Sequence, residues 1–193
     1  VCAMGAPMLI YSYKKYCADT DRFSKTKRRK RMVAIKKKDV LTLVISILIC
    51  QCAGFVGSFF TRPSIPSWYV TLDKPAFTPP SWLFSPVWIT LFLLMGISLF
   101  LIWRRGFTER KVRVALGFFG SQLIFNILWS VLFFGLRSPL AGFIDIVVLW
   151  VAIMLTILYF SKISKIAAVL LLPYLVWVSF ASVLNFFIWR LNL

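Results

Sequence analysis

The chain lacks histidine entirely and has only six acidic residues among its 193. Without histidine, the commonest general base, the commonest metal ligand and the usual axial ligand of haem are all missing. The acids that remain from Met32 onward are Asp39, Asp73, Glu109 and Asp145. They are too few and too scattered for a catalytic carboxylate pair. We therefore predict no metal site and no firm catalytic residue of the acid–base kind.

Charged residues are also scarce, at 15% of the chain against 60% hydrophobic residues. That leaves too little polar surface to cover a soluble globule of this size. Apolar runs of about 20 residues, the length that crosses roughly 30 Å of hydrocarbon as a helix, recur along the sequence. The predicted spans are Val40–Phe60, Phe84–Trp103, Val114–Leu136, Leu140–Phe160 and Ile166–Trp189. Short connections make the later spans antiparallel neighbours. The predicted fold is an all-α membrane protein, a single five-transmembrane-helix bundle.

Basic residues are distributed unevenly about these spans. Of the 23 lysines and arginines, 12 precede Val40, 5 lie in residues 104–113 and 2 in residues 161–165, which leaves 4 for the opposite side. Basic loops stay on the cytoplasmic side. We therefore predict a multi-pass protein of the plasma membrane with a cytoplasmic amino terminus, and with the first loop and the carboxyl terminus facing outward.

The first 31 residues differ in character from the rest. They are rich in lysine and arginine and contain no apolar run long enough to span a membrane. We interpret residues 1–31 as a disordered basic tail or a misannotated extension, and residues 32–193 as the transmembrane domain. Two alternatives for this tail are a nucleic-acid-binding or nuclear-targeting segment and a patch for anionic lipids. The favoured interpretation includes no nucleic-acid partner.

The stretch from Trp68 to Trp88 combines prolines with aromatic residues. It is too proline-rich for a helix and too aromatic for a solvated loop. We predict an ordered loop between the first two spans, packed on the mouth of the bundle. It is the first place to look for a ligand site.

Tryptophans are placed in two ways. Trp103 and Trp189 lie at span ends, where amphipathic rings form interfacial belts. Trp129, Trp150 and Trp177 lie well inside spans, where an indole N–H must find a partner. Bundle packing is an adequate explanation for Trp150.

Polar and aromatic side chains recur at helical spacing near the other two indoles. One stripe consists of Gln122, Asn126, Trp129, Ser130 and Phe133, and a second of Tyr174, Trp177, Ala181 and Asn185. Amides inside a membrane are costly unless they face the bundle interior. Two interpretations stay open: hydrogen bonds between helices, and a ligand cavity covered by the first loop.

Two further residues inside spans invite a structural prediction. Asp145 is the one acid within a span, so we expect it to pair with Arg137 or with backbone amides of the first loop. Pro173 is expected to bend the last helix near Tyr174.

Three motifs together resemble the signature of the TspO/MBR family of tryptophan-rich sensory proteins, translocator proteins and peripheral-type benzodiazepine receptors. The first runs from Trp68-Tyr69 through Lys74-Pro75, Pro79-Pro80 and Pro86-Val87-Trp88 to Met95-Gly96. The second is Gln122-Leu123, Asn126, Trp129 and Phe133-Phe134-Gly135, and the third is Pro173-Tyr174, Trp177, Phe180-Ala181 and Leu184-Asn185. The resemblance covers about residues 40–192.

The resemblance implies a five-helix bundle, commonly a homodimer, that binds protoporphyrin IX, haem or other planar hydrophobic ligands beneath the first loop. The ligand-binding residues that it implies are Tyr69, Trp88, Phe92, Asn126, Trp129, Trp177 and Ala181. It implies no required cofactor, since the porphyrin is the ligand.

The resemblance also carries alternatives. Family members are reported to degrade porphyrin in light and oxygen, which would make Trp88 and Trp177 the redox-active residues. A scaffold or dimerisation protein without a ligand is a third interpretation. Sterol binding is not expected, because Phe186 and Phe187 stand where the sterol-recognition pattern requires tyrosine.

Overall fold

The computed structural model describes residues 37–193. The predicted basic tail, residues 1–31, lies outside the described residues. The chain divides into two compact units, residues 1–40 and residues 41–193, and the architecture below is that of the second.

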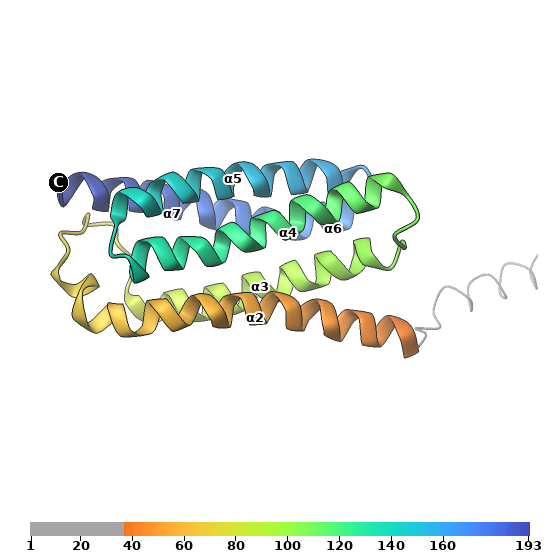
Figure 1. Cartoon of the computed structure of the whole chain (residues 1–193), viewed down its shortest axis with the longest axis horizontal. Helices are drawn as coiled ribbons and strands as arrows, with labels where there is room; N and C mark the ends of the chain where they lie inside the picture. The colour runs from red at the N-terminus through yellow and green to blue at the C-terminus, as the bar shows by residue number, and fades with distance from the viewer. Residues whose placement is uncertain (1–36) are drawn as a thin grey trace, which may run out of the picture. The chain divides into compact units, whose positions relative to one another are not determined.

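Five helices are long and apolar enough to cross a membrane, and the described residues contain no strand, which confirms the predicted fold class (Figure 1). They are α2 (Lys37–Ser67), α3 (Ser81–Trp103), α4 (Arg110–Ser130) with its π-helical extension η2 (Val131–Gly135), α5 (Pro139–Ser161), and α6 (Lys165–Leu170) continued by α7 (Leu172–Leu191). Each exceeds or approaches the 20 or so residues that the hydrocarbon layer requires. The chain is therefore an integral, multi-pass membrane protein.

The first helix runs further than the sequence predicts. The predicted span ends at Phe60, but α2 continues to Ser67 and contains Pro63 and Pro66. Proline removes a backbone donor, and neighbouring groups compensate for this in membrane helices. Here the buried Ser64 hydroxyl donates to the Phe134 carbonyl at 2.9 Å and fastens the end of α2 to η2.

The prediction that residues 68–88 form one non-helical loop is wrong for its second part. Only residues 68–80 are non-helical apart from the 3-10 turn η1 (Tyr69–Thr71), and α3 begins at Ser81 with Pro80 as its N-cap. Pro86 lies inside this helix and removes one backbone donor. The loss of this one backbone hydrogen bond does not interrupt α3, because the apolar residues that follow form a regular helix.

The connections confirm the antiparallel order of the later spans. Arg137 adopts a left-handed φ of 53° in the turn between η2 and α5, and the Ser138 hydroxyl then accepts from the Ala141 N–H to cap α5. The bend predicted near Pro173 is a break at Leu171, which separates α6 from α7.

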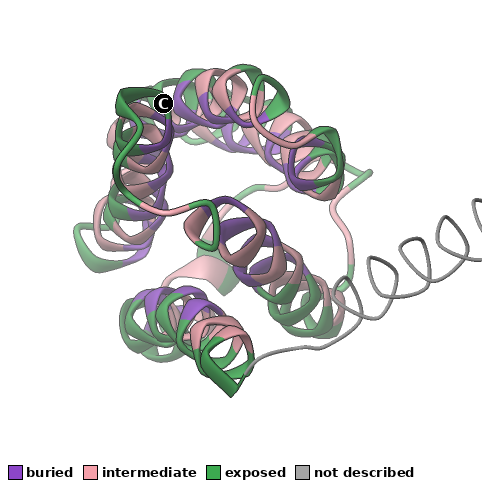
Figure 2. Ribbon diagram, turned by 90° about the vertical axis from the view of Figure 1, so that its right-hand side faces the viewer, coloured by how far each residue is buried: buried purple, intermediate pink, exposed green. Residues whose placement is uncertain are grey.

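The core lies among α3, α4, α5, α6 and α7, whereas α2 contributes only Cys50 and Ala53 to the main buried cluster. Figure 2 shows buried residues on the inward faces of the helices and exposed residues on the outward faces. Large apolar residues on α2, such as Phe55 and Phe59, are exposed, as expected for side chains that face lipid. The first helix is thus held by few contacts, and a glycine supplies one of them: a Cβ on Gly96 would lie 2.7 Å from the Ile47 backbone.

Candidate functional site

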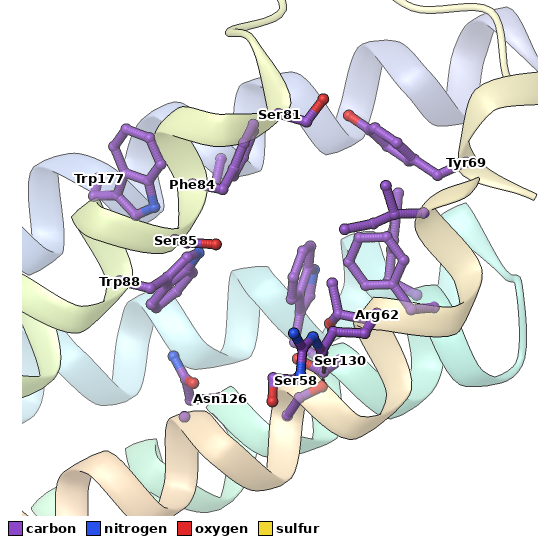
Figure 3. Close-up of a pocket in the computed structure, with 18 of the residues that line it drawn as sticks. Ser58, Arg62, Tyr69, Ser81, Phe84, Ser85, Trp88, Asn126, Ser130 and Trp177 are labelled. Atoms are coloured by element: carbon purple, nitrogen blue, oxygen red, sulfur yellow. Dashed lines mark hydrogen bonds between the residues drawn. The ribbon is translucent and has the colours of Figure 1, made fainter.

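A cavity of about 610 Å³ lies at the end of the bundle that carries the first loop (Figure 3). The second half of α2, the first half of α3, the end of α4 with η2, the turn η1 and the part of α7 from Trp177 onward line it. Antiparallel helices bring these segments together. Its volume falls in the range of sites for small organic ligands, about 300–1,000 Å³. All seven residues predicted to bind ligand line this one cavity: Tyr69, Trp88, Phe92, Asn126, Trp129, Trp177 and Ala181.

Aromatic rings form a large part of the wall. Trp88 stacks on Phe92 with centroids 5.6 Å apart and planes 30° from parallel. Trp129 stacks on Phe133 at 5.2 Å and 16°. Trp177 meets Phe84 edge to face at 5.8 Å. These rings give the cavity flat apolar surfaces from three helices.

Hydrogen bonds between helices fix three of the lining residues. The Trp129 Nε1–H donates to Asn185 Oδ1 at 3.1 Å, and Asn185 Nδ2 donates to the Pro139 carbonyl at 2.8 Å. Asn126 Nδ2 donates to the hydroxyl of fully buried Tyr174 at 2.9 Å. Hydrogen bonding between helices is thus confirmed for these stripes, and the same side chains line a cavity. That a ligand occupies this cavity stays a prediction.

Trp177 differs from the other indoles inside the membrane. Its Nε1–H is buried and has no hydrogen-bond partner among the described residues, and Figure 3 shows the ring at the edge of the cavity beside Ser85. By contrast, Trp150 donates to the Ser179 hydroxyl at 2.8 Å, which confirms its structural explanation. A buried donor without a partner costs free energy, and a ligand acceptor in the cavity would supply the partner.

Two members of the predicted stripes lie behind the cavity wall. Tyr174 does not line the cavity but holds Asn126. Gln122 is 1% exposed, and neither of its amide atoms has a hydrogen-bond partner among residues 37–193.

The pairing expected for Asp145 is wrong. Its side chain is buried, and its Oδ2 has no hydrogen-bond partner in the described part of the chain. Arg137 instead takes a left-handed turn that leaves it exposed.

The sequence did not single out the polar lining residues of α2 and of the first turns of α3. They are Gln51, Ser58, Thr61, Arg62, Ser81 and Ser85. Their spacing was the available signal, since Ser58 and Arg62 lie four residues apart, as do Ser81 and Ser85, and such pairs share a helix face.

The first loop is fastened to the end of α7. Asn192 accepts from the Asp73 N–H at 3.0 Å and donates to the Asp73 carbonyl at 2.9 Å. Phe77 packs edge to face on Phe180 and Phe187. At the start of the loop, Trp68 contacts the aromatic rings of η2. These contacts confirm that the first loop packs on the end of the bundle, and Tyr69 is the residue of this loop that lines the cavity.

Tyr69 occupies the junction between the first loop and the cavity. Its ring lies 5.8 Å from that of Phe134, and the Lys74 ammonium lies 4.9 Å from its centroid. Burial raises the pKa of the Tyr69 phenol above its ordinary value. The hydroxyl therefore keeps its proton at neutral pH and is available as a donor.

Comparison with known proteins agrees with this geometry. The sequence model of the TspO/MBR family matches residues 46–190. The chain is 51% identical over 156 residues to the tryptophan-rich protein TspO of Chlorobaculum tepidum, covering 80% of this chain and 98% of the relative. It is 53% identical over 154 residues to the protein of the same name from Archaeoglobus fulgidus, covering 80% and 99%. The human translocator protein is 40% identical over 140 residues, covering 72% of this chain and 82% of the relative. The five-helix chain with its covered aromatic cavity thus belongs to the TspO/MBR family of membrane proteins.

Proposed function

We propose that this protein is a membrane-embedded receptor, sensor or carrier for porphyrins, such as protoporphyrin IX or haem, and for similar planar hydrophobic ligands. The observation that carries the proposal is the aromatic cavity beneath the first loop, with Trp88, Trp129 and Trp177 in its wall. No resident cofactor is required in this proposal, because the porphyrin is the ligand.

Flat apolar walls suit a flat apolar ligand. A planar ring that enters the cavity exchanges water or lipid contacts for stacking on indole faces, and each aromatic pair contributes about 0.5–1.5 kcal/mol beyond burial of area. Tyr69 and Trp177 add donors that make no hydrogen bond with a described residue. The cavity counts against the scaffold alternative, which predicts a filled interior.

A titration tests the proposal. Protoporphyrin IX is added to the full chain in lipid nanodiscs, and tryptophan quenching is followed. We expect saturable binding to the protein and a loss of affinity of tenfold or more in the double variant Trp88→Ala, Trp177→Ala. The control is Trp150→Phe, which changes an indole outside the cavity. Unchanged affinity in the double variant would exclude these rings from the site.

The second candidate function is an enzyme that breaks the porphyrin in light and oxygen. It is favoured by the placement of both candidate redox residues, Trp88 and Trp177, in the cavity wall. Illuminated mixtures in air would then give new bilin-like absorbance, and mixtures with the double variant would not. Equal bleaching of the porphyrin by the unsubstituted protein and the double variant would exclude this enzyme activity and leave ligand binding as the function.

The same proposal includes the membrane and the assembly. The excess of basic residues before Val40 and in the loop after α3 supports a plasma-membrane protein with a cytoplasmic amino terminus and an outward-facing carboxyl terminus. A face of α4 supports a homodimer. No atom lies within 4 Å of the position that a Cβ on Gly117 would occupy, and Ile124 on the same helix is exposed. Small residues on an exposed helix face allow close approach of a second helix in a membrane. Cysteine cross-linking along this face checks the dimer.

A further inference from the structure

Arg62 gives the cavity a net charge. Among the described residues that line the cavity, Arg62 alone is charged. The four acids in residues 37–193, at positions 39, 73, 109 and 145, do not line it. A positive group in a mostly apolar cleft produces a field that is not cancelled by a nearby carboxylate. The cavity therefore favours a ligand with negative charge.

The Arg62 guanidinium is not used by the fold. It makes no hydrogen bond or ion pair with another residue of the described chain, and its side chain is exposed. Figure 3 shows it in the cavity opening near Ser58, one turn earlier on α2. The Ser58 hydroxyl already donates to the Phe55 carbonyl at 2.7 Å. Arginine keeps its charge at any physiological pH and presents five donors in a planar fork that matches a carboxylate.

Hydroxyl groups around the same opening extend the set of donors. The hydroxyls of Tyr69, Ser81 and Ser85 line the cavity and make no hydrogen bond with another described residue. Lys74, the cation of the first loop, is already engaged, because its ammonium donates to the Leu72 carbonyl at 2.9 Å. An opening with a guanidinium, several hydroxyls and no acid fits an acceptor-rich anion and not an ammonium group.

We propose that Arg62 binds a carboxylate at the edge of the ligand, so that the site selects planar hydrophobic acids over neutral molecules of the same shape. This inference rests on the proposed function and names the class of ligand. The flat body stacks on the rings of the inner wall, while the acid group remains at the opening, where it keeps part of its hydration. A charge-assisted pair in this partly apolar setting corresponds to a preference of about 10- to 100-fold.

The competing explanation is that Arg62 contacts a lipid phosphate, since arginines near helix ends often do so. In that role Arg62 would position the protein in the membrane and would not distinguish charged from neutral ligands. Substitution of Arg62 would then change the affinities for acidic and neutral ligands by the same factor. A matched pair of ligands therefore separates the two explanations.

The experiment compares protoporphyrin IX with its dimethyl ester, which has the same ring without the charges. Affinities are measured by tryptophan quenching for the full chain in nanodiscs of zwitterionic lipid, with protein-free nanodiscs as background. The variants are Arg62→Gln, Arg62→Lys and the control Arg190→Gln, which removes an arginine of α7 that does not line the cavity.

We expect the unsubstituted protein to bind the acid at least tenfold more tightly than the ester. Arg62→Gln should weaken binding of the acid about tenfold and leave the ester unchanged, which also shows that this variant is folded. Arg62→Lys should retain part of the preference, and Arg190→Gln all of it. Equal affinities for the two ligands, or equal losses in Arg62→Gln, would overturn the carboxylate role while porphyrin binding stands. If neither ligand binds the unsubstituted protein, the proposed function fails and this inference with it.

Discussion

The two ends of the bundle are built differently. At the end distant from the first loop, Phe119 stacks on Phe160 at 5.7 Å and 10°, and the buried Ser98 hydroxyl donates to the Ala167 carbonyl at 2.7 Å. At the loop end, the helices surround a cavity, and Trp177 keeps a buried donor without a partner in the described chain. Side chains at the distant end pack against one another, whereas some side chains at the loop end line a cavity and are available to a ligand. The difference indicates that stability and ligand binding depend on separate residues of the same helices.

The largest expected effect comes from opening the packed end. Phe119→Ala removes a ring that is 2% exposed, so we expect a loss of about 3–5 kcal/mol in the free energy of unfolding. Affinity for protoporphyrin IX in the folded fraction should stay within about twofold, because the ring is remote from the cavity lining. Thermal denaturation in detergent measures the first quantity and tryptophan quenching the second.

Phe59→Ala is the matched control, since Phe59 is 72% exposed on α2 and does not line the cavity. A stability loss equal to that of Phe119→Ala would contradict the contrast between the two ends.

The next effect concerns the contact that holds α2. In Gly96→Ala the new methyl group would meet the Ile47 backbone at 2.7 Å, so α2 must move away from α3. We expect a destabilisation of about 1–3 kcal/mol. Gly117→Ala is the control, because nothing lies within 4 Å of its Cβ position. In the monomeric protein the better helix propensity of alanine should leave stability equal or raise it by about 1 kcal/mol or less, whereas in the proposed homodimer the new methyl group would lie on the contact face. A reversed order of the two variants would show that α2 does not depend on this approach.

Two tryptophan substitutions at the loop end should differ from each other. Trp129→Phe leaves Asn185 Oδ1 without its donor, and we expect a stability loss of about 1–3 kcal/mol. Trp177→Phe removes a donor that is already unpaired in the described chain, so stability should change by less than about 1 kcal/mol. Its affinity for protoporphyrin IX should nevertheless fall severalfold. Denaturation and titration of both variants check the pair, and equal destabilisation would show that Trp177 has a structural partner.

The smallest expected effect is on the cover of the cavity. Asn192→Ala removes both hydrogen bonds to the Asp73 backbone. These bonds are exposed, so we expect a change of about 1 kcal/mol or less in stability. Dissociation of protoporphyrin IX should be about 3- to 10-fold faster, because the cover opens more often. Stopped-flow fluorescence measures this rate, with Leu193→Ala as the control. An unchanged rate would mean that the ligand leaves by another route.

Much of this organisation is readable in the sequence. Hydropathy and length are enough to place the five helices, because a membrane span is defined by those two properties. The motifs of α4 and α7 contain Asn126, Trp129 and Trp177, which stand out as polar atoms inside apolar runs. Polar groups are energetically costly in hydrocarbon and therefore rare in membrane spans, so those that occur are easily recognised in a sequence.

The remaining features depend on facts that a sequence pattern does not carry. The helical start of α3 at Ser81 was missed because proline content gives no information on how much packing offsets a lost hydrogen bond. Arg62 was missed because α2 is apolar on all sides, so its inward face cannot be distinguished from its lipid face. That the Asp145 Oδ2 finds no hydrogen-bond partner among residues 37–193 depends on distances between helices.

The π-helical turn η2 determines which aromatic rings support the first loop. Its wide turn is closed by the Leu136 N–H donating to the Val131 carbonyl at 2.8 Å, five residues back. The added residue lets adjacent Phe133 and Phe134 both be buried, and Trp68 packs on both rings. Deleting a single residue here would restore the ordinary helical period and rotate one of the two rings outward. Trp68 would then lose one of the two rings on which it packs, although no residue of the first loop had been altered.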